Sequence, residues 1–212
     1  MILDPLVGVF VTTLLFTETD MNHLLQQAYQ DLPREQHALY VIQSLDLPSP
    51  DTPPTETVPL LRYPFVPYSP EDISRFLHLH CGDGCALSPL QFIVIDRRTK
   101  SGDGTVLYAR SEPGNVDGRE LEMVRLEPHE MNLIPVAVEI GAAGFDEVRE
   151  AAALGLELKF DSQPTNHNKA NHWKVAGSET EGAPVAVASL GLVLKRALSN
   201  LIKRSSVAIG SV

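Results

Sequence analysis

The chain has 212 residues, a formal net charge of −10 and 43% hydrophobic residues. This composition is that of an ordinary globular protein, and it excludes a chain that is disordered throughout. The acidic balance argues against nucleic acid as a partner, because an acidic surface repels the phosphate backbone.

The N-terminal part, residues 1–45, predicts a β-α-β extension that packs on the core. Residues 7–16 are apolar and β-branched, which indicates a buried strand. Thr19 or Asp20 can then cap a helix, and residues 37–45 indicate a second strand, although the preceding "PREQ" also permits a helix. The four prolines of residues 46–57 predict a linker or surface loop.

Residues 58–160 are expected to form the core α/β domain. Ser69 followed by Pro70 predicts the start of a helix. Strands are expected at residues 58–65, 90–96, 105–111, 118–127 and 133–140, and a short helix at residues 145–154. Residues 161–184 read as a polar loop or lid, and residues 185–212 as an amphipathic helix and tail. The predicted fold class is α/β (α+β), with helices packed on a mixed β-sheet rather than on an all-parallel one.

Three segments of the core resemble an uncharacterised domain family of bacterial and fungal proteins whose function is unknown. They are "LLRYPF" at residues 60–65, "FIVID" at 92–96 and "NLIPVAVEIGAAGFDEVREA" at 132–151. Family members are similar in an LLR-x-x-F start, a hydrophobic strand ending in Asp, and an Asn-Leu segment leading to a helix. Where the family usually has Thr-Asp, this chain has Tyr63 and Pro64. The resemblance implies a domain near residues 58–155 and no particular activity.

Two histidines and two cysteines, His78, His80, Cys81 and Cys85, lie close together in the sequence. Three ligands from one helix end could bind zinc, but structural zinc sites usually carry paired knuckles and no second pair occurs here. We therefore predict no metal, a helix that ends at the glycines, and cysteines packed as small apolar residues. A redox pair across the Gly-Asp-Gly turn is a third interpretation. With only two cysteines no disulfide framework is expected, so a reducing, cytoplasmic location is the default.

Polar groups at the ends of strands are the candidates for chemistry. Asp96 ends an apolar strand, where ligands of α/β sheets gather, although Arg97 and Arg98 could simply neutralise it. Histidine titrates near neutral pH, which makes His129 a candidate base. The predicted catalytic residues are His129, Asp96 and Arg62, and the predicted ligand-binding residues are Trp173, Tyr63 and Phe65.

Two hypotheses of function follow. The chain has no nucleotide-binding, serine-hydrolase or zinc-protease motif. The first hypothesis is therefore an enzyme without a cofactor, such as a cyclase, isomerase or pericyclase of secondary metabolism, with an apolar pocket for a hydrophobic small molecule. The alternative is a non-catalytic module that binds another protein, and homo-oligomerisation is left open. The C-terminal helix has no Trp or Phe on its apolar face, which argues against a membrane as partner.

Overall fold

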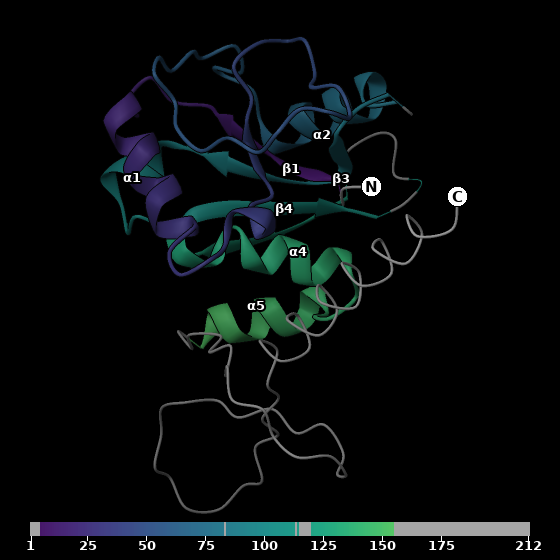
Figure 1. Ribbon diagram of the computed structural model, residues 1–212. Helices are drawn as coiled ribbons and strands as arrows, with labels where there is room; N and C mark the ends of the chain where they lie inside the picture. The colour runs from purple at the N-terminus through teal and green to yellow at the C-terminus, as the bar shows by residue number, and fades with distance from the viewer. Residues whose placement is uncertain (1–4, 83, 113, 115–119, 155–212) are drawn as a thin grey trace, which may run out of the picture. The chain divides into compact units, whose positions relative to one another are not determined.

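A mixed five-stranded sheet is the centre of the fold. The computed structural model of the chain describes residues 5–154 except 83, 113 and 115–119. The strands are β1 (Leu6–Val11), β2 (Leu39–Val41), β3 (Leu87–Ile95), β4 (Val106–Ser111) and β5 (Leu121–Leu126). They lie in the order β2-β1-β3-β4-β5 (Figure 1). The predicted mixed sheet with packed helices is therefore confirmed.

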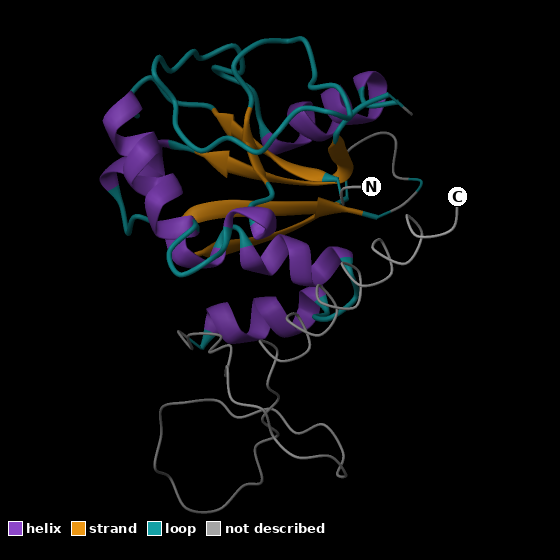
Figure 2. Cartoon of the chain, viewed as in Figure 1, coloured by secondary structure: helices purple, strands orange, loops and turns teal. Residues whose placement is uncertain are grey.

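Strand direction divides this sheet into two parts. β1 pairs with β2 on one side and with β3 on the other, and both pairings are parallel. β4 runs antiparallel to β3, and β5 antiparallel to β4. The arrowheads in Figure 2 accordingly point in two opposite directions. All six residues of β1 are buried, as expected of a central strand covered on both faces.

Two helices connect the parallel strands, and each begins with a capping box. In α1 (Glu18–Ala28) the N-cap is Thr17, whose hydroxyl accepts the backbone N–H of Asp20. The N-cap predicted at Thr19 or Asp20 was therefore displaced by two or three residues. In α2 (Pro70–His80) the N-cap is Ser69, as predicted, and Asp72 completes the box. The connections leave β1 and β2 in opposite directions, so right-handed crossovers place α1 and α2 on opposite faces of the sheet.

The core beneath α2 is rich in aromatic rings. Phe65 is fully buried there, and its ring meets Phe10 edge to face at a centroid distance of 4.8 Å. Phe10 in turn meets Phe92 at 5.8 Å, and Ile73 and Leu77 of α2 belong to the same cluster. This cluster fixes α2 on β3 and seats the segment that carries Phe65.

The Pro-rich segment covers the outer edge of β2. The backbone N–H of Thr55 donates to Leu39 O at 2.8 Å, and the Thr55 hydroxyl accepts the N–H of Val41 at 3.0 Å. These two bonds satisfy groups that an edge strand would otherwise expose. Residues 1–45 and 58–136 contribute strands to one sheet, in which β1 lies between β2 and β3.

Two predicted strands are not strands. Residues 58–65 contain no strand, and Pro59 and Pro64, which lack an N–H for a ladder, explain why. Most of the segment 133–140 instead forms a helix, α4 (Leu133–Glu139). Pro135 is compatible with its first turn, and a short apolar run does not distinguish a buried helix from a buried strand.

The remaining helices are short. α3 (Arg97–Ser101) follows β3, and the 3₁₀ helices η1 (Arg34–Gln36) and η2 (Pro128–Glu130) precede β2 and follow β5. The chain divides into a unit of residues 2–136 and a second unit that begins at Ala137. The second unit contains the predicted helix near residue 145, α5 (Phe145–Ala153), with Phe145 and Val148 buried. The predicted loop at 161–184 and helix at 185–204 lie outside the described residues.

Cys81 and Cys85 form a disulfide, with a Cα–Cα distance of 5.2 Å. Cys81 is the C-cap of α2, so the bond links the end of this helix to the turn before β3. The prediction of two unpaired cysteines was wrong, because the intervening turn brings the ends of a five-residue segment together. The reducing, cytoplasmic location was predicted because no disulfide framework was expected from two cysteines, and the Cys81–Cys85 disulfide weakens this argument.

We expect iodoacetamide to label no cysteine in the denatured, unreduced chain and to label both after treatment with dithiothreitol, as read by intact mass. Replacing both cysteines by serine should lower the free energy of unfolding by about 2 kcal/mol, because the closed loop is short. Urea denaturation with and without reductant measures this loss, and the double serine variant should not respond to reductant. Two labels without reductant would contradict the assignment.

Candidate functional site

The three parallel strands end at one edge of the sheet, which we call the carboxyl edge. β4 begins and β5 ends at the same edge, because each runs antiparallel to its neighbour. From β1 the chain leads to β2 on one side, while from β3 it leads to β4 on the other. Ligands of open α/β sheets bind outside such a switch point. The carboxyl edge is therefore where a site is expected.

Asp96 lies at this edge but is fully engaged. Its carboxylate forms an ion pair with Arg125 from the end of β5. It also accepts the backbone N–H of Thr99 at 3.0 Å and so acts as the N-cap of α3. The bland interpretation, a neutralised aspartate, is closer to this geometry than a catalytic one, although the partner is Arg125 rather than the predicted Arg97 or Arg98.

Opposing effects act on the pKa of Asp96. Burial raises the pKa of this carboxyl, but the hydrogen bonds from Arg125 and Thr99, together with the positive charge of Arg125, outweigh burial. The pKa of Asp96 consequently lies below its usual value, so the group is ionised at neutral pH. A carboxylate held in this way is a poor general base.

Arg62 and His129 also belong to the carboxyl edge. The backbone N–H of Arg62 donates to Gln43 Oε1 at 3.2 Å, in the segment that follows β2. The Arg62 side chain is exposed. His129 is exposed within η2, which follows β5 and packs against α1. The three predicted catalytic residues thus share one edge but come from different strand ends.

Of the predicted ligand-binding residues, Tyr63 and Phe65 have structural contacts. The Tyr63 hydroxyl donates to Phe16 O at 2.7 Å, and burial is the main cause that raises the pKa of this phenol. Phe65 belongs to the buried aromatic cluster and has no exposed surface. Trp173 lies outside the described residues.

A surface groove of about 400 Å³ opens at the carboxyl edge. Its lining comes from α1, from the region of α3, and from the start of η2. His23 lines it, and no pattern in the sequence marks this residue, because it is one polar position of an amphipathic helix. The lining residues are Phe16, Asp20, His23, Leu24, Gln27, Thr99, Lys100, Asp103, Gly104, Glu127 and Pro128.

The charges within this groove are largely paired. Lys100 Nζ donates to both carboxylate oxygens of Asp20 at 2.7 Å. This hydrogen bond is the main cause that lowers the pKa of Asp20. Asp103 accepts the hydroxyl of Thr105 at 2.6 Å and also forms an ion pair with Arg98. The groove therefore offers shape and polar groups but few charges that are free to act on a ligand.

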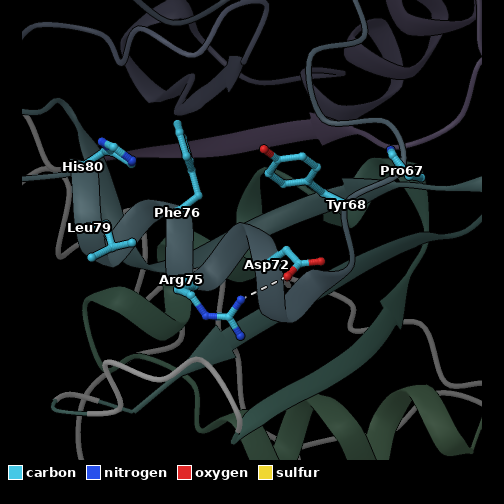
Figure 3. Close-up of a pocket in the computed structure, with 7 residues that line it drawn as sticks. All are labelled: Pro67, Tyr68, Asp72, Arg75, Phe76, Leu79 and His80. Atoms are coloured by element: carbon cyan, nitrogen blue, oxygen red, sulfur yellow. Dashed lines mark hydrogen bonds and ion pairs between the residues drawn. The ribbon is translucent and has the colours of Figure 1, made fainter.

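A second groove, of about 470 Å³, lies along α2 (Figure 3). The rings of Tyr68, Phe76 and His80 lie toward one side of the helix, and the Asp72–Arg75 ion pair lies toward the other. The ring of Phe76 also contacts that of Phe65, with 5.0 Å between the ring centroids, so the core fixes the position of Phe76. This groove is apolar and aromatic on one wall only.

Four exposed leucines at the carboxyl edge were not predicted from the sequence. Leu14 and Leu15, predicted within a buried strand, are 68% and 49% exposed. The strand stops at Val11, and the N–H of Leu15 instead donates to the Thr13 hydroxyl in a local turn. Leu45 and Leu60 are 55% and 57% exposed. The Thr12-Thr13 pair was the available signal, since threonine hydroxyls compete with strand pairing at such ends.

The histidines beside the disulfide contribute little to a site. His78 Nδ1 lies 2.9 Å from Ser74 O, one turn earlier in α2, and so donates to this carbonyl. Within the described ranges of the chain, no group of three histidine, cysteine, aspartate or glutamate side chains is placed to hold a metal ion. No helix in the described part of the chain is both long and apolar enough to cross a membrane.

Comparison of the chain with family models, with curated proteins and with solved structures finds no match. The resemblance to an uncharacterised domain family therefore stays a prediction.

Replacing Phe65 by Ala should lower the free energy of unfolding by about 3–5 kcal/mol, because a fully buried ring is lost. Tyr68 is 37% exposed and its ring meets that of Phe65, so Tyr68→Ala is the matched control and should cost clearly less. Urea denaturation measures both. An F65A variant as stable as the parent chain would instead favour the predicted role of Phe65 in binding a ligand.

Replacing Asp96 by Asn should cost about 1–3 kcal/mol at pH 7, since the ion pair and cap are weakened. A folded pKa below the unfolded one means that the carboxylate stabilises the fold fully above about pH 4. This contribution disappears as the pH falls through the lower, folded pKa. The free energies of unfolding of the parent chain and of Asp96→Asn, measured by urea denaturation, should therefore converge in acid. Asp51→Asn changes an exposed aspartate and should leave the free energy of unfolding unchanged at both pH values.

Proposed function

We propose that this chain is a non-catalytic protein-interaction module that docks its partner at the carboxyl edge. The observation that carries the proposal is the exposure of Leu14, Leu15, Leu45 and Leu60, which we call the leucine edge. Single exposed leucines are ordinary, but several at one place are typical of a surface that is covered by a partner.

Specific contacts bring the leucine edge together. Leu14 and Leu15 follow β1, and Leu45 follows the adjacent parallel strand β2. Leu60 comes from a segment far along the chain that is tied to the same edge. The N–H of Leu61 donates to Glu18 Oε1 at 3.3 Å, and the Tyr63 hydroxyl donates to Phe16 O. The rigid sheet thus holds three loops beside one another.

The state of the polar groups supports binding over catalysis. Asp96 is ionised and bonded to Arg125 and Thr99, and the acidic groups Asp20 and Asp103 of the nearby groove are each bonded to a cation. Acid–base catalysis needs groups that can exchange a proton with a substrate. Binding of a protein needs only an apolar centre and a polar rim.

A photo-crosslinking residue, benzoylphenylalanine, placed at Leu60 of the full chain in the source cells should give one discrete adduct of higher mass. The changes Leu14→Ser and Leu15→Ser together should reduce this adduct at least about tenfold, because buried anchors are lost. Both leucines are exposed, so the free energy of unfolding should shift by less than about 0.5 kcal/mol.

Leu79, which is 72% exposed near the C-terminal end of α2, provides the control position. Equal yields of adduct with benzoylphenylalanine at position 60 and at position 79 would contradict the proposal. So would an adduct from position 60 that persists when Leu14 and Leu15 are both replaced by serine.

A second candidate is the cofactor-independent enzyme for a hydrophobic small molecule. The groove of about 400 Å³ supports it, because its size suits such a ligand and it opens at the switch point of the sheet. Thermal stabilisation of the chain by an apolar metabolite, lost on His23→Ala and unaffected by the serine changes at Leu14 and Leu15, would favour this candidate.

A further inference from the structure

Most of the lysines and arginines that the structure describes are paired with a carboxylate. Ion pairs are formed by Arg34, Arg75, Arg98, Lys100, Arg110, Arg125 and Arg149. Among the lysines and arginines that the structure describes, Arg62 and Arg97 are the two without an ion pair, and both are exposed. These two arginines, rather than the paired cations, are informative about partners.

Both exceptions lie at the carboxyl edge. Arg97 is the first residue of α3, two positions after β3 ends. Arg62 lies two positions after Leu60 in the segment tied to Gln43. Since β1 lies between β2 and β3, the turn with Leu14 and Leu15 comes between the two arginines along this edge.

We propose that the partner at the leucine edge is a protein segment that carries Asp or Glu beside apolar side chains. This inference rests on the proposed function and names the chemistry of its partner. Leucines supply the apolar centre, while Arg62 and Arg97 each donate hydrogen bonds to a carboxylate of the partner at the rim.

The neighbouring charges support this polarity. Asp96, adjacent to Arg97, is neutralised by Arg125, and Asp20 at the start of α1 is neutralised by Lys100. Next to Arg62, the backbone N–H of Leu61 donates to the Glu18 carboxylate at 3.3 Å. Arginine stays charged at any physiological pH, so both guanidinium groups are available to a partner.

The net charge of −10 decides between anionic partners. A membrane of anionic lipid or a nucleic acid presents a broad negative surface, which the acidic body would repel. A short acidic segment meets only the local positive charge of the edge. Local charge complementarity mainly accelerates association and selects the partner.

The test begins with a random peptide library displayed on phage and selected on the full chain. Selected peptides should combine Leu, Phe or Trp with Asp or Glu, and the serine changes at Leu14 and Leu15 should abolish their binding. Arg62→Glu and Arg97→Glu should each lower the affinity for a synthetic copy of a selected peptide about tenfold. Arg75→Glu, which changes the net charge equally on α2, should leave its affinity unchanged. Raising the salt from 50 to 500 mM should lower the affinity of the parent chain for this peptide. It should not lower the affinity of the variant that carries both Arg62→Glu and Arg97→Glu.

Each alternative has its own signature. Peptides that depend on the leucines but lack acidic residues, or ignore both arginine changes, would overturn this inference and leave the proposed function standing. Peptides that bind regardless of the leucines would overturn both. Binding to vesicles containing 30% phosphatidylserine without any selected peptide, or a dimer in sedimentation that the serine changes abolish, would replace the acidic segment with a membrane or a second copy.

Discussion

The parallel pairing of β1 with both β2 and β3 is the constraint on which the rest of the structure depends. It requires two crossover helices, which cover opposite faces of the sheet, and it forces three strand ends to one edge. Because β1 is buried along its whole length, a one-residue slip would move Phe10 out of the aromatic cluster. The edge is therefore held by the core, and its loops can vary without loss of the fold.

Side chains distant in sequence then fix the loops to this framework. Asn132 is buried, accepts the N–H of Ala38 at 2.9 Å and donates to Gln36 O at 3.1 Å, so it binds the segment before β2 to the segment after η2. Asn22 of α1 makes a similar two-way contact with the backbone of Val58, at 2.7 and 3.0 Å. Each amide satisfies one donor and one acceptor that burial would otherwise leave unpaired.

Local signals in the sequence predict most of the fold, and long-range contacts decide the remainder. The Ser69-Pro70 start of α2 and the apolar run of β3 are readable because cap chemistry and burial act within a few residues. The helix α4 was mistaken for a strand because its apolar run suits either element. The pairing of Cys81 with Cys85 was only a third interpretation of the sequence, because it depends on the distance between two Cα atoms, which spacing alone does not fix. The position of Asp96 after a strand made it a candidate in the sequence. Its ion pair with Arg125 of β5 depends on how the strands are arranged in the sheet, which no local pattern predicts.

The leucine edge follows from a conflict between composition and geometry. Residues 7–16 look like one apolar strand, yet the chain must turn after Val11 to begin α1 at Glu18 on one face of the sheet. The apolar residues past the turn, Leu14 and Leu15, cannot follow the strand into the core. A sequence that needed only solubility would carry polar residues there, at no cost to the sheet. Apolar side chains kept at such a turn, with unpaired arginines beside them, are best explained by a surface that is buried in a complex.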